Sequence, residues 1–202
     1  MYKKIDLKYD SLEPYIDDLT LNIHYNKHYL KYLNNLNTLL NNFSYDYRYN
    51  LEELIRNIDE FDSNVRGDIL FNIGGVLNHE LYFKNLNLNT YEPTGLLKDA
   101  IDNKYGSFNN FKQEFINSAN NLRGSGFTFL VIKDNDLDII NLPNFETPYM
   151  YNMIPLIALD MFEHAYYIKY QNNKEQYIKN FFSIIDFKEV EKNYEKEIQK
   201  IK

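Results

Sequence analysis

The sequence predicts an α+β protein in which a helical hairpin precedes a half that mixes helices with three strands. Two long segments with helical periodicity, one beginning near Leu21 and one spanning residues 65–88, fill most of the first ninety positions. Three short apolar runs at residues 127–132, 137–142 and 154–159 have the composition of strands. A Pro- and Gly-containing break at residues 91–95 separates the two regions. We therefore expect domains at residues 1–90 and 91–202.

Composition restricts the chemistry. The 202 residues are 44% hydrophobic, which is enough for a sizeable core. The chain has no Cys, so disulfides and thiolate ligands are excluded, and any metal must be held by His, Asp or Glu. A net charge of −7 argues against a general nucleic-acid surface.

No apolar run is long enough to cross a bilayer, so we expect no membrane partner. The first six residues, beginning Met1-Tyr2-Lys3, lack the apolar region of a secretory signal. A cytoplasmic location is expected, with an organelle as the alternative if a leader has been removed.

The first long helix carries a histidine pattern. Thr20 is its expected N-cap, and His24, His28 and Tyr32 follow at intervals of four residues, which keeps them near one face. A leucine stripe continues along the same helix, so a core-facing helix with two incidental histidines is the simpler interpretation of this segment alone.

The second long helix, residues 65–88, carries His79 one turn after Gly74-Gly75. Glycine in a helix interior costs about 1 kcal/mol relative to alanine. Such a pair indicates that another segment approaches closely or that room is left for something bound. Two antiparallel helices with inward histidines could supply ligands from both arms.

The second half begins with helices expected at residues 96–101 and 108–122. Residues 127–132 and 137–142 then flank a polar turn as a β-hairpin, and a third strand over 154–159 leads directly into Asp160. An amphipathic helical tail over residues 174–202 closes the chain.

Asp160 and His164 lie four residues apart, so on a helix they would project from one face and could reach one cation. Glu163 and Tyr167 form a second such pair. If three of the four histidines meet Asp160, the resulting site suits Fe, Mn or catalytic Zn. From spacing alone, scattered surface histidines explain the sequence equally well.

Five motifs occur in a fixed order: His24-Tyr25-Asn26-Lys27-His28 with Tyr32, Asn78-His79-Glu80-Leu81-Tyr82-Phe83, Gly124-Ser125-Gly126-Phe127, residues 160–167, and Tyr170 with Asn172. In order and spacing they resemble the iron/manganese superoxide dismutases. The likeness covers nearly the whole chain, and residues 160–167 are its most specific part.

The resemblance implies an N-terminal helical hairpin followed by an α/β domain with a three-stranded antiparallel sheet. It implies an antioxidant oxidoreductase that disproportionates superoxide to O2 and H2O2 at one Fe or Mn ion per subunit. The implied metal ligands are His24, His79, Asp160 and His164. By the same resemblance His28 and Tyr32 line the substrate passage, and Glu163, Tyr167, His28 and Ser125 contact the partner in a homodimer.

One feature of the family is missing. A glutamine usually hydrogen-bonds the metal-bound solvent, but its two usual positions are occupied here by Gly75 and, in the loop at residues 144–148, by Phe145. Asn144 or Glu146 would replace it if the loop register shifted by one residue. The loss motivates an alternative function, a non-catalytic metal-binding or structural relative.

A hydrolytic Zn enzyme is a third interpretation, because it uses the same ligand types. It would require a general base, and the nearby carboxylate, Glu163, is better explained by the dimer contact that the resemblance implies.

Overall fold

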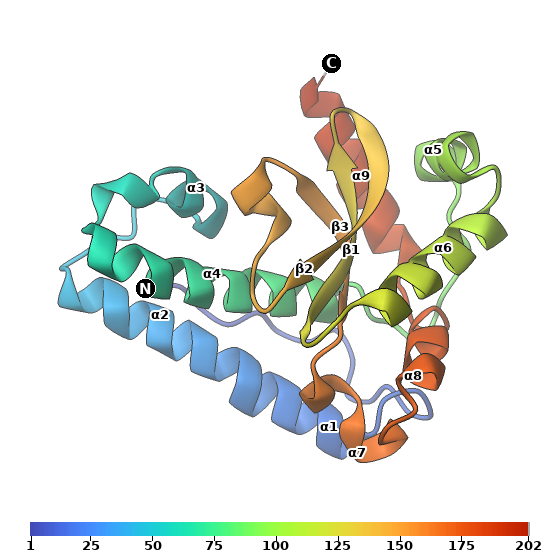
Figure 1. The fold of residues 1–202 in the computed structure, drawn as a ribbon, viewed down its shortest axis with the longest axis horizontal. Helices are drawn as coiled ribbons and strands as arrows, with labels where there is room; N and C mark the ends of the chain where they lie inside the picture. The colour runs from blue at the N-terminus through green and yellow to red at the C-terminus, as the bar shows by residue number, and fades with distance from the viewer. Residues whose placement is uncertain (202) are drawn as a thin grey trace.

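The computed structural model describes residues 1–201 and confirms the expected fold class. A helical N-terminal half is followed by an α/β half with a three-stranded antiparallel sheet (Figure 1). Within the described residues, no helix has both the length and the apolar character needed to span a bilayer.

The N-terminal half is built on two long antiparallel helices that lie side by side below the sheet in Figure 1. Its elements are α1 (Asp18–Ile23), the π-helical turn η1 (His24–Tyr29), α2 (Leu30–Asn42), α3 (Leu51–Arg56), the 3-10 turn η2 (Ile58–Glu60) and α4 (Ser63–Lys84).

The predicted start of the first helix was wrong. The N-cap is Asp17, not Thr20, and the helix begins at Asp18. The Asp17 carboxylate accepts hydrogen bonds from the Thr20 backbone N–H at 2.8 Å and from its hydroxyl at 2.6 Å. A carboxylate satisfies the free N–H groups at a helix N-terminus and favours its positive end, so the earlier acidic residue is the cap.

The histidine pattern of the first helix lies on an irregular turn. Residues His24–Tyr29 form η1, which is wider than an α-helix and interrupts the continuous helix expected here. Such turns occur frequently at functional sites. His24, at its first position, is fully buried, whereas His28 in the next turn is only half-buried. His24 and His28 therefore differ in burial, although a regular helix would place both on one face.

The C-terminal half places helices around the sheet. Its elements are α5 (Gly95–Tyr105), α6 (Phe108–Asn121), β1 (Gly126–Lys133), β2 (Asp136–Pro143), the 3-10 turn η3 (Pro148–Tyr151), β3 (Ile154–Asp160), the 3-10 turn η4 (Glu163–Ala165), α7 (Tyr167–Tyr170), α8 (Lys174–Phe181) and α9 (Phe187–Ile201).

The strand order is β2-β1-β3, with β1 central and buried along nearly its whole length. β3 pairs with β1 on one edge and faces α4 on the other. The pairing of Phe127 with Asp160 sets the end of β3 beside the start of β1. Asp160 is therefore delivered into the interior between the sheet and the helical hairpin.

The glycine pair in α4 marks a close approach, as expected. A Cβ on Gly74 would lie 1.7 Å from the backbone oxygen of Phe145, and one on Gly75 would lie 2.5 Å from the ring of Tyr32. Only hydrogen fits between these groups. The missing side chains let the loop after β2 and the first long helix both lie directly against α4.

Gly74→Ala is expected to lower the free energy of unfolding by on the order of 1–3 kcal/mol, because the new methyl group forces the Phe145 carbonyl away from α4. Gly67→Ala is the matched control, because a Cβ at Gly67 in the same helix meets nothing within 4 Å. Alanine there is expected to raise stability by up to about 1 kcal/mol. Urea unfolding of both variants checks this, and equal stability of the two would contradict the close approach.

Candidate metal centre

Three histidines converge on one carboxylate oxygen of Asp160. Asp160 Oδ2 lies 3.0 Å from His24 Nε2, 3.1 Å from His164 Nε2 and 3.7 Å from His79 Nε2. The four potential ligand atoms all lie within 4.8 Å of one another. His24, His79 and Asp160 are at most 1% exposed, and His164 is partly exposed. The structure thus brings together the four residues predicted as metal ligands.

Each donor comes from a different element. His24 begins η1, His79 lies in α4, Asp160 is the last residue of β3, and His164 lies in η4. The expectation that the third strand leads into Asp160 is confirmed, whereas the single helix face that Asp160 and His164 were expected to share is not formed. A strand end and a short 3-10 turn bring them together, because the chain bends sharply after β3 and the Phe162 N–H donates to Asp160 Oδ1 at 2.8 Å.

The hydrogen bonds around the cluster orient its donor atoms inward. His79 Nδ1 donates to the Gly75 carbonyl at 2.5 Å, which leaves its Nε2 unprotonated, buried and without a hydrogen-bond partner. A second ring nitrogen held in this way is the usual arrangement of a metal-binding histidine. The Tyr177 hydroxyl donates to the Asp160 backbone oxygen at 2.9 Å and holds the end of β3 in place.

Burial affects the protonation states of the potential metal ligands. It lowers the pKa of His24 to about 4, although the bond to Asp160 opposes the shift, and it lowers the pKa of His79 to about 3. Burial alone would raise the pKa of Asp160, but the adjacent His164 and His24 outweigh it, so the pKa lies below its ordinary value. At neutral pH the rings of His24 and His79 are therefore neutral, and Asp160 is ionised.

The donor set fits a transition-metal ion. Inward lone pairs of ring nitrogens and an ionised carboxylate repel one another unless a proton or a cation lies between them. The unpartnered Nε2 of His79 shows that hydrogen bonds do not satisfy the whole cluster. Three nitrogens and one oxygen without sulfur suit Fe, Mn or Zn.

Aromatic rings pack around the donors. The ring centroid of His28 lies 4.1 Å from that of His164, and the ring centroid of Tyr32 lies 5.6 Å from that of His79, both in stacked geometry. Burial raises the pKa of Tyr32, so its phenol stays protonated near neutral pH. The predicted passage residues therefore lie directly against the donor histidines.

Phe145 occupies the loop position beside the site. It is buried, with its ring centroid 4.4 Å from Tyr32, 4.6 Å from Phe162 and 5.8 Å from His79. The alternative residues point elsewhere: Asn144 is exposed, and Glu146 accepts a hydrogen bond from the Tyr151 hydroxyl at 2.5 Å. The loop register does not shift, and an apolar ring replaces the expected amide.

The residues predicted at a dimer contact lie at the surface next to the centre. Glu163 flanks the donor His164 in η4 and is exposed, and Tyr167 is 48% exposed at the start of α7. Ser125 is partly buried in the turn before β1. His28 is half-buried and stacks on His164.

Two neighbours of the centre have no signal in the sequence. Tyr177 reaches Asp160 from α8. Phe71 in α4 is 45% exposed and packs against both Tyr32 and Phe145. Both belong to apolar helical patterns that are typical of any core, so only the packing reveals that they adjoin the donors.

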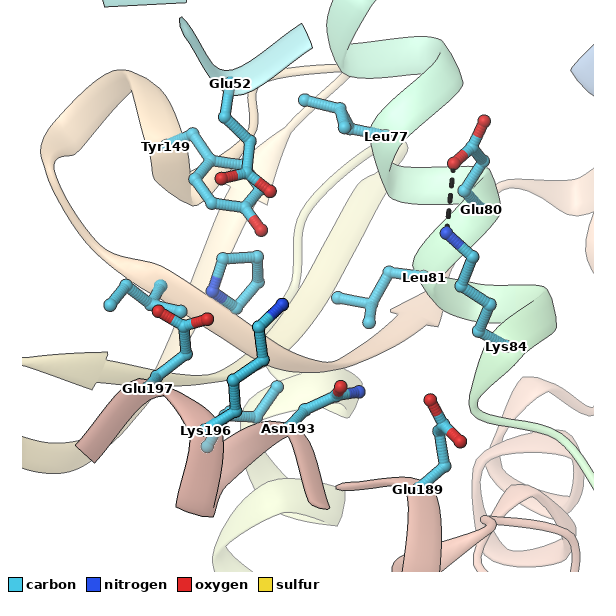
Figure 2. A pocket seen from close by; sticks show the side chains of 13 residues that line it. Glu52, Leu77, Glu80, Leu81, Lys84, Tyr149, Glu189, Asn193, Lys196 and Glu197 are labelled. Atoms are coloured by element: carbon cyan, nitrogen blue, oxygen red, sulfur yellow. Dashed lines mark hydrogen bonds and ion pairs between the residues drawn. The ribbon is translucent and has the colours of Figure 1, made fainter. Parts of the chain in front are cut away.

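The cavity in Figure 2 lies apart from the metal centre. Its volume is about 310 Å³, and it lies between α4, β3 and α9. Both acidic and basic side chains line it, among them Glu52, Glu80, Lys84 and Lys196, and the ion pair of Glu80 with Lys84 lies on one side. None of the predicted site residues lines it.

Comparisons with known proteins agree along the chain. The family model described as iron/manganese superoxide dismutases, alpha-hairpin domain, matches residues 1–87, and that for the C-terminal domain matches residues 93–193. The chain is similar to Superoxide dismutase [Mn/Fe] 2 of Staphylococcus aureus strains MW2, USA300 and COL. Each is 37% identical to it over 187 residues, which are 93% of both chains.

His79→Ala is expected to abolish binding of a transition-metal ion, because it removes the donor whose free Nε2 faces the cluster. His28→Ala is the control, because it removes a neighbouring histidine that lies outside the donor set. Elemental analysis gives the metal content, and thermal unfolding gives the stabilisation by added Mn²⁺, expected to be about 2.7 kcal/mol at a hundredfold excess over the dissociation constant. A His79→Ala protein that keeps one ion per chain would contradict the assignment.

Proposed function

The chain belongs to the iron/manganese superoxide dismutases, and from this membership we propose that His24, His79, Asp160 and His164 hold its catalytic ion. The protein is an oxidoreductase that disproportionates superoxide to O2 and H2O2 with Fe or Mn as cofactor. The observation that carries the residue assignment is the convergence of four potential ligand atoms within 4.8 Å, three of them on buried residues.

The donors support this chemistry through their charge. Fe or Mn, when bound, supplies the one-electron couple that the reaction needs, which Zn lacks. The imidazoles of His24 and His79 carry no charge, so the single carboxylate of Asp160 cancels only one unit of the ion's positive charge. The remaining positive charge attracts the superoxide anion in an interior of low polarity, where electrostatic attraction is strong.

Tyr32 and His28 serve the approach to the donors in this proposal. The ring of Tyr32 stacks on His79, and its phenol can hold a proton because burial raises its pKa. His28 contacts His164 on the side toward the surface and is only half-buried. The two side chains can thus supply hydrogen bonds at the mouth of a site whose remaining wall is aromatic.

The proposed assembly is a homodimer through the surface around η4 and α7. Tyr167 and Ile168 expose 48% and 49% of their surface, and Leu19 in the adjacent α1 exposes 56%. Exposed apolar side chains that lie next to one another favour a protein contact. Glu163 lies among them, one residue before His164, so a contact here would also cover the outer side of the metal centre.

Two further proposals concern organisation. The domain boundary near residue 90 is supported by the gap between the family matches, which end at residue 87 and resume at residue 93. A cytoplasmic location is consistent with the absence of a bilayer-spanning helix among residues 1–201.

The activity itself is tested with protein loaded separately with Fe and with Mn. At least one form is expected to remove superoxide far faster than the same concentration of free ion. A loaded protein that is no faster than the free ion would instead favour the non-catalytic relative suggested by the absent glutamine.

Tyr32→Phe is expected to lower kcat by on the order of 10- to 100-fold with the metal content unchanged, because it removes a positioned proton without removing a donor. Tyr151→Phe is the control, because this exposed hydroxyl bonds only Glu146 away from the donors. Pulse-radiolysis kinetics on both variants checks the result. Equal rates in Tyr32→Phe and the parent would exclude Tyr32 from proton supply.

Tyr167→Ala is expected to weaken self-association by on the order of 2 kcal/mol, because a large aromatic residue at the centre of a contact carries much of its energy. Tyr91→Ala is the matched control, since Tyr91 is similarly exposed but lies in the connection between the two halves. Sedimentation equilibrium of the metal-loaded proteins gives the dissociation constants. A monomeric parent protein would refute the dimer.

A further inference from the structure

Asn85, the C-cap residue of α4, is completely buried, and each of its nitrogen and oxygen atoms makes a hydrogen bond. Its backbone N–H donates to Leu81 O at 2.9 Å, and its backbone oxygen accepts from the Asp186 N–H at 2.6 Å. Its side-chain Nδ2 donates to Leu156 O at 3.1 Å, and its Oδ1 accepts from the Ala158 N–H at 3.0 Å. One residue therefore joins α4, β3 and the segment before α9.

The side-chain bonds complete an otherwise unpaired sheet edge. β3 pairs with β1 on one side only, so the backbone groups on its other edge need partners inside the protein. Leu156 and Ala158 are two apart, and one residue of a parallel strand would likewise donate to the first and accept from the second. The carboxamide of Asn85 substitutes for that missing residue.

The residues that these bonds join are close in sequence to two of the proposed ligands. Asn85 follows His79 by six residues in sequence, and Ala158 precedes Asp160 by two on the same strand. Among the described residues, no other hydrogen bond joins α4 or its cap to β3. The separation of His79 Nε2 from Asp160 Oδ2, 3.7 Å, is also the longest from the carboxylate to a donor histidine.

We propose that Asn85 is a positioning residue that fixes His79 relative to Asp160 and thereby determines how tightly the site holds its ion. The proposal rests on the ligand assignment proposed above. Apolar side chains between α4 and β3 exclude water but allow small sliding movements, whereas a pair of hydrogen bonds from one amide is directional. The paired bonds therefore define the position of α4 along β3.

The test compares Asn85→Leu, which keeps the approximate shape of the side chain and removes both bonds, with Asn87→Leu. Asn87→Leu also removes two hydrogen bonds, but neither reaches β3. Asn87 Nδ2 donates to Asp186 Oδ2, and Asn87 Oδ1 accepts from the Asn89 N–H. Each variant is loaded with Mn²⁺. Its dissociation constant is measured by chelator competition, its Mn²⁺ electron paramagnetic resonance spectrum is recorded, and its thermal unfolding is followed without metal.

Both variants are expected to lose several degrees of thermal stability. Only Asn85→Leu is expected to weaken Mn²⁺ binding, by about 10- to 100-fold, and to change the spectrum. Only this substitution removes the hydrogen bonds that fix His79 relative to Asp160. Asn85→Ser provides the same measurements if the leucine variant does not fold, since the short hydroxyl cannot bridge both backbone groups.

Unchanged Mn²⁺ affinity and spectrum in the folded Asn85 variant would overturn the proposal and leave Asn85 with a purely structural role. The same result in Asn87→Leu as in Asn85→Leu would also overturn it. Failure of the ligand assignment is distinguishable, because then the parent protein would bind no ion or His79→Ala would still bind one.

Discussion

The burial of one carboxylate is the constraint on which the rest of this structure depends. Asp160 is fully buried, and an ionised carboxylate removed from water is costly unless it is paired and hydrogen-bonded. Nearby groups offset this cost. Two histidine nitrogens lie 3.0 and 3.1 Å from the carboxylate, a third lies at 3.7 Å, and the Phe162 N–H donates a hydrogen bond to it. The same arrangement assembles a donor set for a metal ion. Every element that carries a donor must therefore meet at the end of β3.

The aromatic surroundings of the donors have opposite effects on the two kinds of titratable group. Burial lowers the pKa values of His24 and His79, so they are neutral and available as ligands, and raises that of Tyr32, so it keeps its proton. Phe145 extends this apolar wall to the loop position where the resemblance led us to expect a glutamine. In this wall His28 and Tyr32 are polar side chains that stack directly on His164 and His79.

Helix α4 is held on both sides of His79 by contacts with the C-terminal half. Five residues before it, Gly74 lies directly against the Phe145 carbonyl, and six residues after it, Asn85 bonds the free edge of β3. The first contact depends on the absence of a side chain, and the second on one amide. Between them, His79 is oriented by its bond to Gly75 O. Steric fit and directional hydrogen bonds thus act together on a single ligand.

Periodicity, glycine positions and motif spacing are local properties, so the sequence by itself determined the order and type of the main elements. The four candidate donors followed from the resemblance of its motifs to a known family. Tertiary structure decided what depends on contacts between remote segments. Asp160 and His164 meet through a strand end and a 3-10 turn, since pairing with β1 keeps residue 160 extended. Phe145 turns inward while Asn144 turns outward, and Asn85 finds partners 71 and 73 residues away. Side-chain direction and long-range hydrogen bonding follow from packing, and no local pattern encodes them.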